Sequence, residues 1–119
     1  MEDAVKMFDM KVLHVGINAK DADQAKGWAD EFQQFFNIPE KMGNSSVWAG
    51  NLVEIMKGNG RGTHGHIALG VNDCDKAIEY FKGLGVNPIE ETRKVVDGKT
   101  TFTYLDKEIA GFAIHLNQL

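Results

Sequence analysis

Alternating apolar and polar residues near the N-terminus predict a first strand over residues 10–19, MKVLHVGINA. Asp21 or Asp23 then supplies a side-chain cap for a helix, because a carboxylate there accepts hydrogen bonds from the free N–H groups of the first turn. The helix ends before Pro39, and turn signals at Gly43-Asn44 and Gly50-Asn51 mark two short strands, 45–49 and 52–57. The apolar stripe of this helix consists of Ala25, Trp28, Ala29, Phe32, Phe35 and Phe36.

The second half of the chain repeats this plan. The run HVGINAKDADQA, opened by His14, matches HIALGVNDCDKA, opened by His66, position by position. A strand over 64–71 precedes a helix capped by Asp73 or Asp75. Strands over about 89–96 and 99–106 flank Asp97-Gly98, which is a strong hairpin signal, and a last strand covers 111–118.

These elements predict an α+β protein of one domain, residues 1–119, built from two βαβββ modules. The first module covers 10–57, the second covers 63–119, and the glycine-rich segment 58–62 is a flexible joint between them. The two modules form one curved mixed sheet with both helices on its outer face.

Strand parity places the polar residues that bear chemistry on the other face. In four strands the large apolar side chains share one face, as Leu13, Val15 and Ile17 do in the first. The opposite face carries His14, Glu54, His66 and His115 among small residues. Buried imidazoles and a carboxylate need partners, and a metal ion is one partner that serves all four. A lone strand histidine is usually structural, but four matching positions favour a metal site.

Composition and charge argue against several classes of function. A net charge of -4 argues against nucleic-acid or membrane-surface binding, and no apolar run is long enough to span a bilayer. The single cysteine, Cys74, lies between two aspartates that disfavour a thiolate, so we expect no catalytic role for it. Without a signal-like N-terminus, we expect a cytoplasmic protein.

The repeated openings HVGI and HIAL, each followed by an aspartate, resemble the vicinal-oxygen-chelate superfamily, which includes glyoxalase I, bleomycin-resistance proteins, extradiol dioxygenases and methylmalonyl-CoA epimerase. The resemblance implies a glyoxalase-like fold, a homodimer and metal ligands on the first and last strand of each module, here His14, Glu54, His66 and His115. It departs from the family at His115, where glyoxalase I and the epimerases typically have a glutamate. The segments KVLHVGINAK, GNSSVWAG and EIAGFAIHLNQL also resemble a small domain fused to some bacterial 2-keto-3-deoxy-6-phosphogluconate aldolases.

Three functions follow as hypotheses. The first is a metal-dependent lyase or isomerase that acts on a small 2-oxo- or 2-hydroxy-carbonyl compound, with one divalent ion (Zn, Ni, Fe, Mn or Co) and Glu54 as the catalytic base. The second is a non-catalytic accessory module with an aldolase partner. The third is a metal-free sequestering dimer like the bleomycin-resistance proteins, against which the four filled ligand positions count.

Other residues have two interpretations. His64 lies at the rim of the site or is a loop histidine. Trp48 and Phe102 line the cavity or, as is commoner for strand aromatics, pack in the core. The basic residues Lys57, Arg61, Arg93 and Lys94 bind an anionic group of the substrate or are simply solvated.

Overall fold

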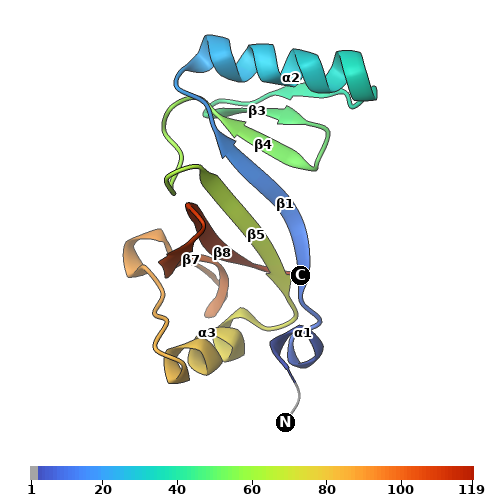
Figure 1. Ribbon diagram of the computed structural model, residues 1–119. Coiled ribbons are helices and arrows are strands. Elements are labelled where there is room, and N and C mark those ends of the chain that lie inside the picture. The colour runs from blue at the N-terminus through green and yellow to red at the C-terminus, as the bar shows by residue number, and fades with distance from the viewer. Residues whose placement is uncertain (1–2) are drawn as a thin grey trace.

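A single eight-stranded sheet organises the chain (Figure 1). The computed structural model describes residues 3–119, and the strand order is β2-β3-β4-β1-β5-β8-β7-β6. The sheet is mixed and curved, and the two longer helices cover its outer side, which confirms the predicted α+β fold. The elements in chain order are α1 (Ala4–Met7), β1 (Lys11–Asn18), α2 (Ala22–Phe36), β2 (Glu40–Met42), β3 (Ser46–Ala49), β4 (Val53–Met56), β5 (Gly65–Val71), α3 (Cys74–Gly83), the 3₁₀ helix η1 (Glu90–Thr92), β6 (Lys94–Val96), β7 (Lys99–Ile109) and β8 (Phe112–Gln118).

The helix of the first half, α2, lies over β3 and β4. The Asp21 carboxylate accepts a hydrogen bond from the N–H of Gln24 and caps its first turn. Its last turn closes at Asn37, whose φ of 55° is the left-handed conformation that ends many helices. Ala25 and Ala29 are fully buried against Val47 and Ile55, because small residues let the helix approach the sheet closely.

The helix of the second half, α3, lies over β7 and β8 and is capped by Asp73. Cys74, Ala77 and Ile78 on α3 join Leu116 of β8 in a second buried cluster, which is separate from the first. Since Val47, Ile55 and Leu116 alternate with Trp48, Glu54 and His115 along their strands, both helices cover the face opposite the predicted metal ligands.

The modules meet at β1 and β5, which pair antiparallel in the middle of the sheet. On either side, β1 pairs parallel with β4, and β5 pairs parallel with β8. This symmetric arrangement brings the first and last strand of each module together at the centre. It is the reason why residues far apart in the chain meet there.

Three local predictions differ from the structure. The first half contains an additional short strand, β2, beside β3. The segment predicted as strand 89–96 is strand only from residue 94, because the Thr92 hydroxyl accepts the N–H of Tyr104 and donates to the carbonyl of Ile89. Strand β7 also runs past residue 106 to Ile109, and a two-residue turn with positive φ at Ala110 and Gly111 then leads into β8.

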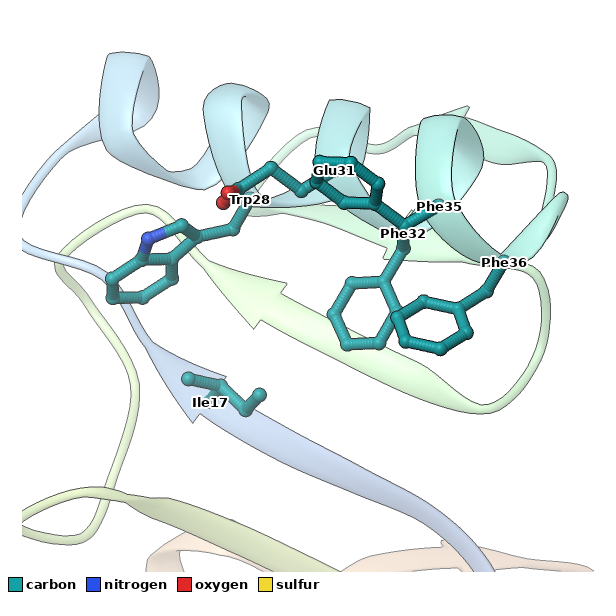
Figure 2. Close-up of a pocket in the computed structure, with 6 residues that line it drawn as sticks. All are labelled: Ile17, Trp28, Glu31, Phe32, Phe35 and Phe36. Carbon is teal, nitrogen blue, oxygen red and sulfur yellow. The ribbon is translucent and has the colours of Figure 1, made fainter.

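Part of the outer face carries no covering helix. A groove of about 380 Å³ lies between α2 and β1, lined by Ile17, Trp28, Glu31, Phe32, Phe35 and Phe36 (Figure 2). The rings of Phe32 and Phe36 point from α2 toward the side where Ile17 lies. Phe35 and Phe36 are 65% and 70% exposed, so the apolar stripe of α2 is wider than the surface that the sheet covers.

None of the helices in residues 3–119 has the length and apolar character needed to traverse a lipid bilayer.

Candidate metal centre

Four neighbouring central strands carry the four predicted ligands: His14 on β1, Glu54 on β4, His66 on β5 and His115 on β8. Strand register brings them together. Gly16 of β1 is paired with both Glu54 and His66, while Ala68 of β5 is paired with both His14 and His115. Each histidine or glutamate is thus separated from the next by a small residue on the neighbouring strand, which leaves room for the larger side chains to converge.

Gly16 makes this convergence possible. A Cβ atom at this position would lie only 2.0 Å from Cε1 and Nδ1 of the His66 ring. The imidazole of His66 therefore occupies the space where any other residue at position 16 would place its side chain. Its own exposure is only 1%, so the ring has little freedom to move aside.

The donor atoms lie close together. Nε2 of His14 is 3.2 Å from Nε2 of His66, and Oε1 of Glu54 is 3.1 Å from His66 Nε2 and 3.6 Å from His14 Nε2. One nitrogen from each of His14, His66 and His115 lies within 4.8 Å of the others. Metal–nitrogen bonds of about 2.0–2.1 Å place neighbouring donors about 2.9–3.4 Å apart. The spacings among His14, His66 and Glu54 lie in or close to this range, and His115 joins the two other imidazoles at distances of up to 4.8 Å.

The pKa values of the clustered side chains favour the protonation states that metal binding requires. Burial, together with the neighbouring His66 and His14, lowers the pKa of His115 to about 4. Burial also lowers the pKa of His14, against the opposing effect of Glu54. A hydrogen bond with His66 and another from Ser46 hold the pKa of Glu54 below its ordinary value despite burial. At neutral pH, His14 and His115 are thus uncharged and Glu54 is ionised, which is the state that a metal requires.

The cluster contains polar atoms without protein partners. Nδ1 of His66 and Nδ1 of His115 are buried and have no hydrogen-bond partner among the described residues. Both side chains are almost completely removed from water, at 1% and 3% exposure. For His66 the nitrogen that faces His14 and Glu54 is Nε2, so an ion at the spacings given above would bind that nitrogen and leave Nδ1 as a buried donor without a partner.

Aromatic side chains surround the imidazoles. The Trp48 ring centroid lies 4.9 Å from that of His14, and the Phe102 and Tyr104 centroids lie 4.7 and 5.0 Å from that of His115. Trp48 and Phe102 therefore line the site, and the alternative interpretation as core residues was wrong. Sequence reasoning missed Tyr104, although it shares the parity of Phe102 and stands opposite His115.

Two further placements concern polar side chains. Ser46, which the sequence did not single out, donates its hydroxyl to Oε2 of Glu54 at 2.9 Å and orients the carboxylate. His64 packs against Phe112, with ring centroids 6.5 Å apart. It does not belong to the group of three imidazoles formed by His14, His66 and His115. This placement agrees with the interpretation of His64 as a loop histidine.

Comparison with known proteins gives a fold assignment. No protein-family model and no curated protein sequence matches the chain. Among solved structures, methylmalonyl-CoA epimerase in complex with methylmalonyl-CoA and NH4+ superposes with a TM-score of 0.61 at 18% identity, over 92% of this chain and 94% of that one. A hypothetical protein from Bacillus halodurans C-125 gives 0.60 at 16% identity, over 92% and 94%. The epimerase from Mycobacterium tuberculosis gives 0.54 at 19%, over 90% and 86%.

The resemblance to an aldolase-fused domain has no counterpart among these structures and stays a prediction. Sequence identities of 16–19% support a shared fold but do not show a shared function. The chain has the glyoxalase-like fold that methylmalonyl-CoA epimerase has, with three histidines and a glutamate gathered on the inner face of its sheet.

Proposed function

We propose that the protein is a metal-dependent isomerase or lyase of the glyoxalase type, acting on a small 2-oxo- or 2-hydroxy-carbonyl compound. The observation that carries this proposal is the convergence of His14, His66 and Glu54 at donor–donor spacings of 3.1 to 3.6 Å, with His115 beside them. One divalent ion held by these four side chains would polarise a carbonyl chelated through two neighbouring oxygens and stabilise the enolate formed by proton loss.

Glu54 is the proton acceptor in this proposal. Its carboxylate is ionised at neutral pH, and Ser46 holds Oε2 while Oε1 faces the two imidazoles. Breaking the C–H bond next to the carbonyl transfers the proton to Glu54, and return of a proton to the same carbon completes an isomerisation. Since the structural neighbours include an epimerase, a reaction that proceeds through proton loss beside a carbonyl is the most economical assignment.

Metal retention tests the donor set. Protein purified without an affinity tag should contain one divalent ion per chain by elemental analysis. His14→Ala and His66→Ala should lose most of it, and His115→Ala should bind it more weakly. His64→Ala is the matched control, because this exposed histidine packs against Phe112, and it should retain the ion. Wild-type metal content in His14→Ala or His66→Ala would contradict the proposal.

Proton exchange tests the role of Glu54. In D2O, metal-loaded protein should catalyse loss of the ¹H NMR signal next to the carbonyl in a member of a panel of 2-oxo and 2-hydroxy acids. Glu54→Gln should slow this exchange about 10²- to 10⁴-fold, the contribution that a positioned base typically makes. Glu79→Gln, an exposed glutamate on α3, is the matched control and should exchange like wild type. Exchange at the wild-type rate in Glu54→Gln would remove Glu54 as the base.

We also propose that the protein is a homodimer, in which a second copy of the chain covers the apolar groove between α2 and β1. A two-fold dimer contact needs a surface that is complementary to itself, and the groove beside the exposed rings of Phe35 and Phe36 offers a hollow and a ridge side by side. Since the groove lies on the outer face, pairing there leaves the inner face free for substrate.

A further inference from the structure

Two cationic side chains lie over two aromatic rings of the metal centre. The guanidinium carbon of Arg61 is 5.3 Å from the centroid of the Tyr104 ring, and Nζ of Lys94 is 5.1 Å from that of Phe102. Both rings in turn contact the imidazole of His115, with centroids 5.0 and 4.7 Å away. The two cations are therefore one aromatic ring removed from a proposed ligand.

The backbone around Arg61 is held in place. The Nδ2 group of Asn18, on the same face of β1 as His14, donates to the carbonyl of Arg61 at 3.2 Å and to that of Gly62 at 2.8 Å. Gly58 and Gly62 have φ values of 97° and 87°, which other residues rarely adopt. In the structure, residues 58–62 follow a path that places Arg61 over Tyr104.

Charge distinguishes this position from an ordinary solvated surface. The chain as a whole has a net charge of -4, yet Arg61 and Lys94 place two positive charges beside a cluster in which Glu54 is the acidic side chain. Arg61 and Tyr104 also line a hollow of about 230 Å³. Lys107 lines that hollow as well, as do the carboxylates of Asp106 and Glu108, which remain ionised while accepting the N–H groups of Asn87 and Thr63.

A weak contact is the main competitor for Arg61. Its Nη2 atom lies 3.6 Å from Oε1 of Glu91, a side chain that is 78% exposed. An exposed pair at this distance contributes little stability, so an incoming anion can displace it. The ammonium of Lys94 lies over the Phe102 ring, and within residues 3–119 it forms no ion pair with a carboxylate.

We propose that Arg61 and Lys94 form an anion-binding rim of the metal centre, and that the substrate carries a carboxylate or phosphate group in addition to its two neighbouring oxygens. This inference rests on the proposed function, since it requires one substrate to reach both the imidazoles, with its two neighbouring oxygens, and the rim, with its anionic group. Arg61 offers a planar set of donors for an oxyanion, and Lys94 offers a point charge. Both are specificity-determining residues that contact a part of the substrate that does not react.

Binding of defined probes tests the rim. The chain has two tryptophans, so Trp28→Phe leaves Trp48, 4.9 Å from His14, as the reporter of binding at the centre. In this background, the fluorescence of metal-loaded protein is titrated with 2-oxoglutarate, phosphoglycolate and the neutral diketone butane-2,3-dione. Arg61→Gln and Lys94→Gln should each weaken the preferred anion about ten- to hundredfold, and change the neutral diketone less than about twofold. The anion with the larger loss identifies the group as carboxylate or phosphate.

Controls separate charge from folding. Arg61→Lys keeps the charge and should recover part of the affinity, while Lys82→Gln, on the exposed side of α3, should bind both anions like wild type. Every variant is checked for metal content and unfolding temperature. The rim would be overturned if the affinity for both anions changed by less than about twofold in both Arg61→Gln and Lys94→Gln. It would also be overturned if protein with Arg61 and Lys94 intact bound neither anion.

The same samples separate this inference from the proposed function. Protein that retains no metal and catalyses no proton exchange, but still binds an anion in a manner that depends on Arg61 and Lys94, would overturn the function and support the rim. Protein that retains its metal and exchanges protons, but binds neutral and anionic probes equally, would support the function and overturn the rim.

Discussion

At the scale of single residues, the environment of the imidazoles decides their chemistry. His115 is 3% exposed and lies beside two other imidazoles, so its neutral form is strongly favoured. A neutral imidazole has a lone pair available for an ion, whereas an imidazolium does not. The free energy of unfolding should therefore depend on pH and on the concentration of a divalent metal ion.

This linkage predicts a loss of stability in acid. The pKa of His115 is about 4 in the folded protein against 6.5 for the ordinary side chain, so the unfolded chain takes up the proton first. The stability that this residue contributes is complete above pH 6.5 and falls as the pH drops toward 4, by about 3 kcal/mol in total. The lowered pKa of Glu54 acts in the same direction below its ordinary value.

Denaturant unfolding of chelator-treated protein between pH 7.5 and 4 measures this effect. His115→Gln should flatten the pH dependence, and added divalent ion should move the loss of stability to lower pH, because metal and proton compete for the same nitrogen. A pH dependence that is unchanged in His115→Gln would show that this imidazole is not the group responsible.

At the scale of elements, strand pairing at β1 depends on a residue that has no side chain. Gly16 stands between Glu54 on β4 and His66 on β5, and the His66 ring fills the space beside it. The strand motif HVGI therefore includes both the candidate ligand His14 and the glycine that leaves space for the ring of His66.

Gly16→Ala should displace the His66 ring. Overpacking of this kind typically costs about 1–3 kcal/mol of unfolding free energy, and the displaced imidazole should bind metal more weakly. Gly27→Ala is the matched control: nothing lies within 4 Å of the added Cβ in α2, and a helix-interior alanine should stabilise the protein by about 0.5–1 kcal/mol. Denaturant unfolding and elemental analysis of both variants provide the comparison. Unchanged stability and metal content in Gly16→Ala would contradict the packing argument.

At the scale of the whole molecule, the two modules lie side by side and not one on the other. The described chain extends over 44 × 31 × 25 Å, and its radius of gyration of 15.2 Å exceeds the about 13.5 Å typical of a compact domain of this length. The two buried clusters lie at opposite ends of the sheet, which leaves the apolar side of the central strands only half-buried.

A dimer through the outer groove would cover this surface. Light scattering should give about twice the chain mass of 13.2 kDa, and the double variant Phe35→Glu, Phe36→Glu should run as a monomer that keeps its metal. Leu84→Glu places a negative charge on a similarly exposed residue just after the C-terminal end of α3, and this variant should remain dimeric. A monomeric wild type, or a dimer that survives the double substitution, would exclude this surface as the interface.

How much the sequence predicts depends on the range of the interaction. The parity of the four strands and the presence of an aspartate cap at each helix follow from local patterns, and the structure selects Asp21 and Asp73 from the two aspartates predicted at each position. The 3₁₀ helix at Glu90–Thr92 and the extension of β7 to Ile109 were missed, because they depend on bonds to Tyr104 and on a turn with positive φ at an alanine. Trp48 and Phe102 were ambiguous for the same reason, since parity gives the face of a strand but not what lies across from it.

The repeated pattern of the chain thus determined the two modules, the face that carries each polar residue and the set of candidate ligands, because these depend on neighbours along a strand or helix. Only the tertiary structure decided that the His66 ring occupies the space beside Gly16, that Tyr104 contacts His115 while Arg61 lies over Tyr104, and that His64 lies apart. These are contacts between residues far apart in the chain, and they form only when strand register and the path of the joint bring them together.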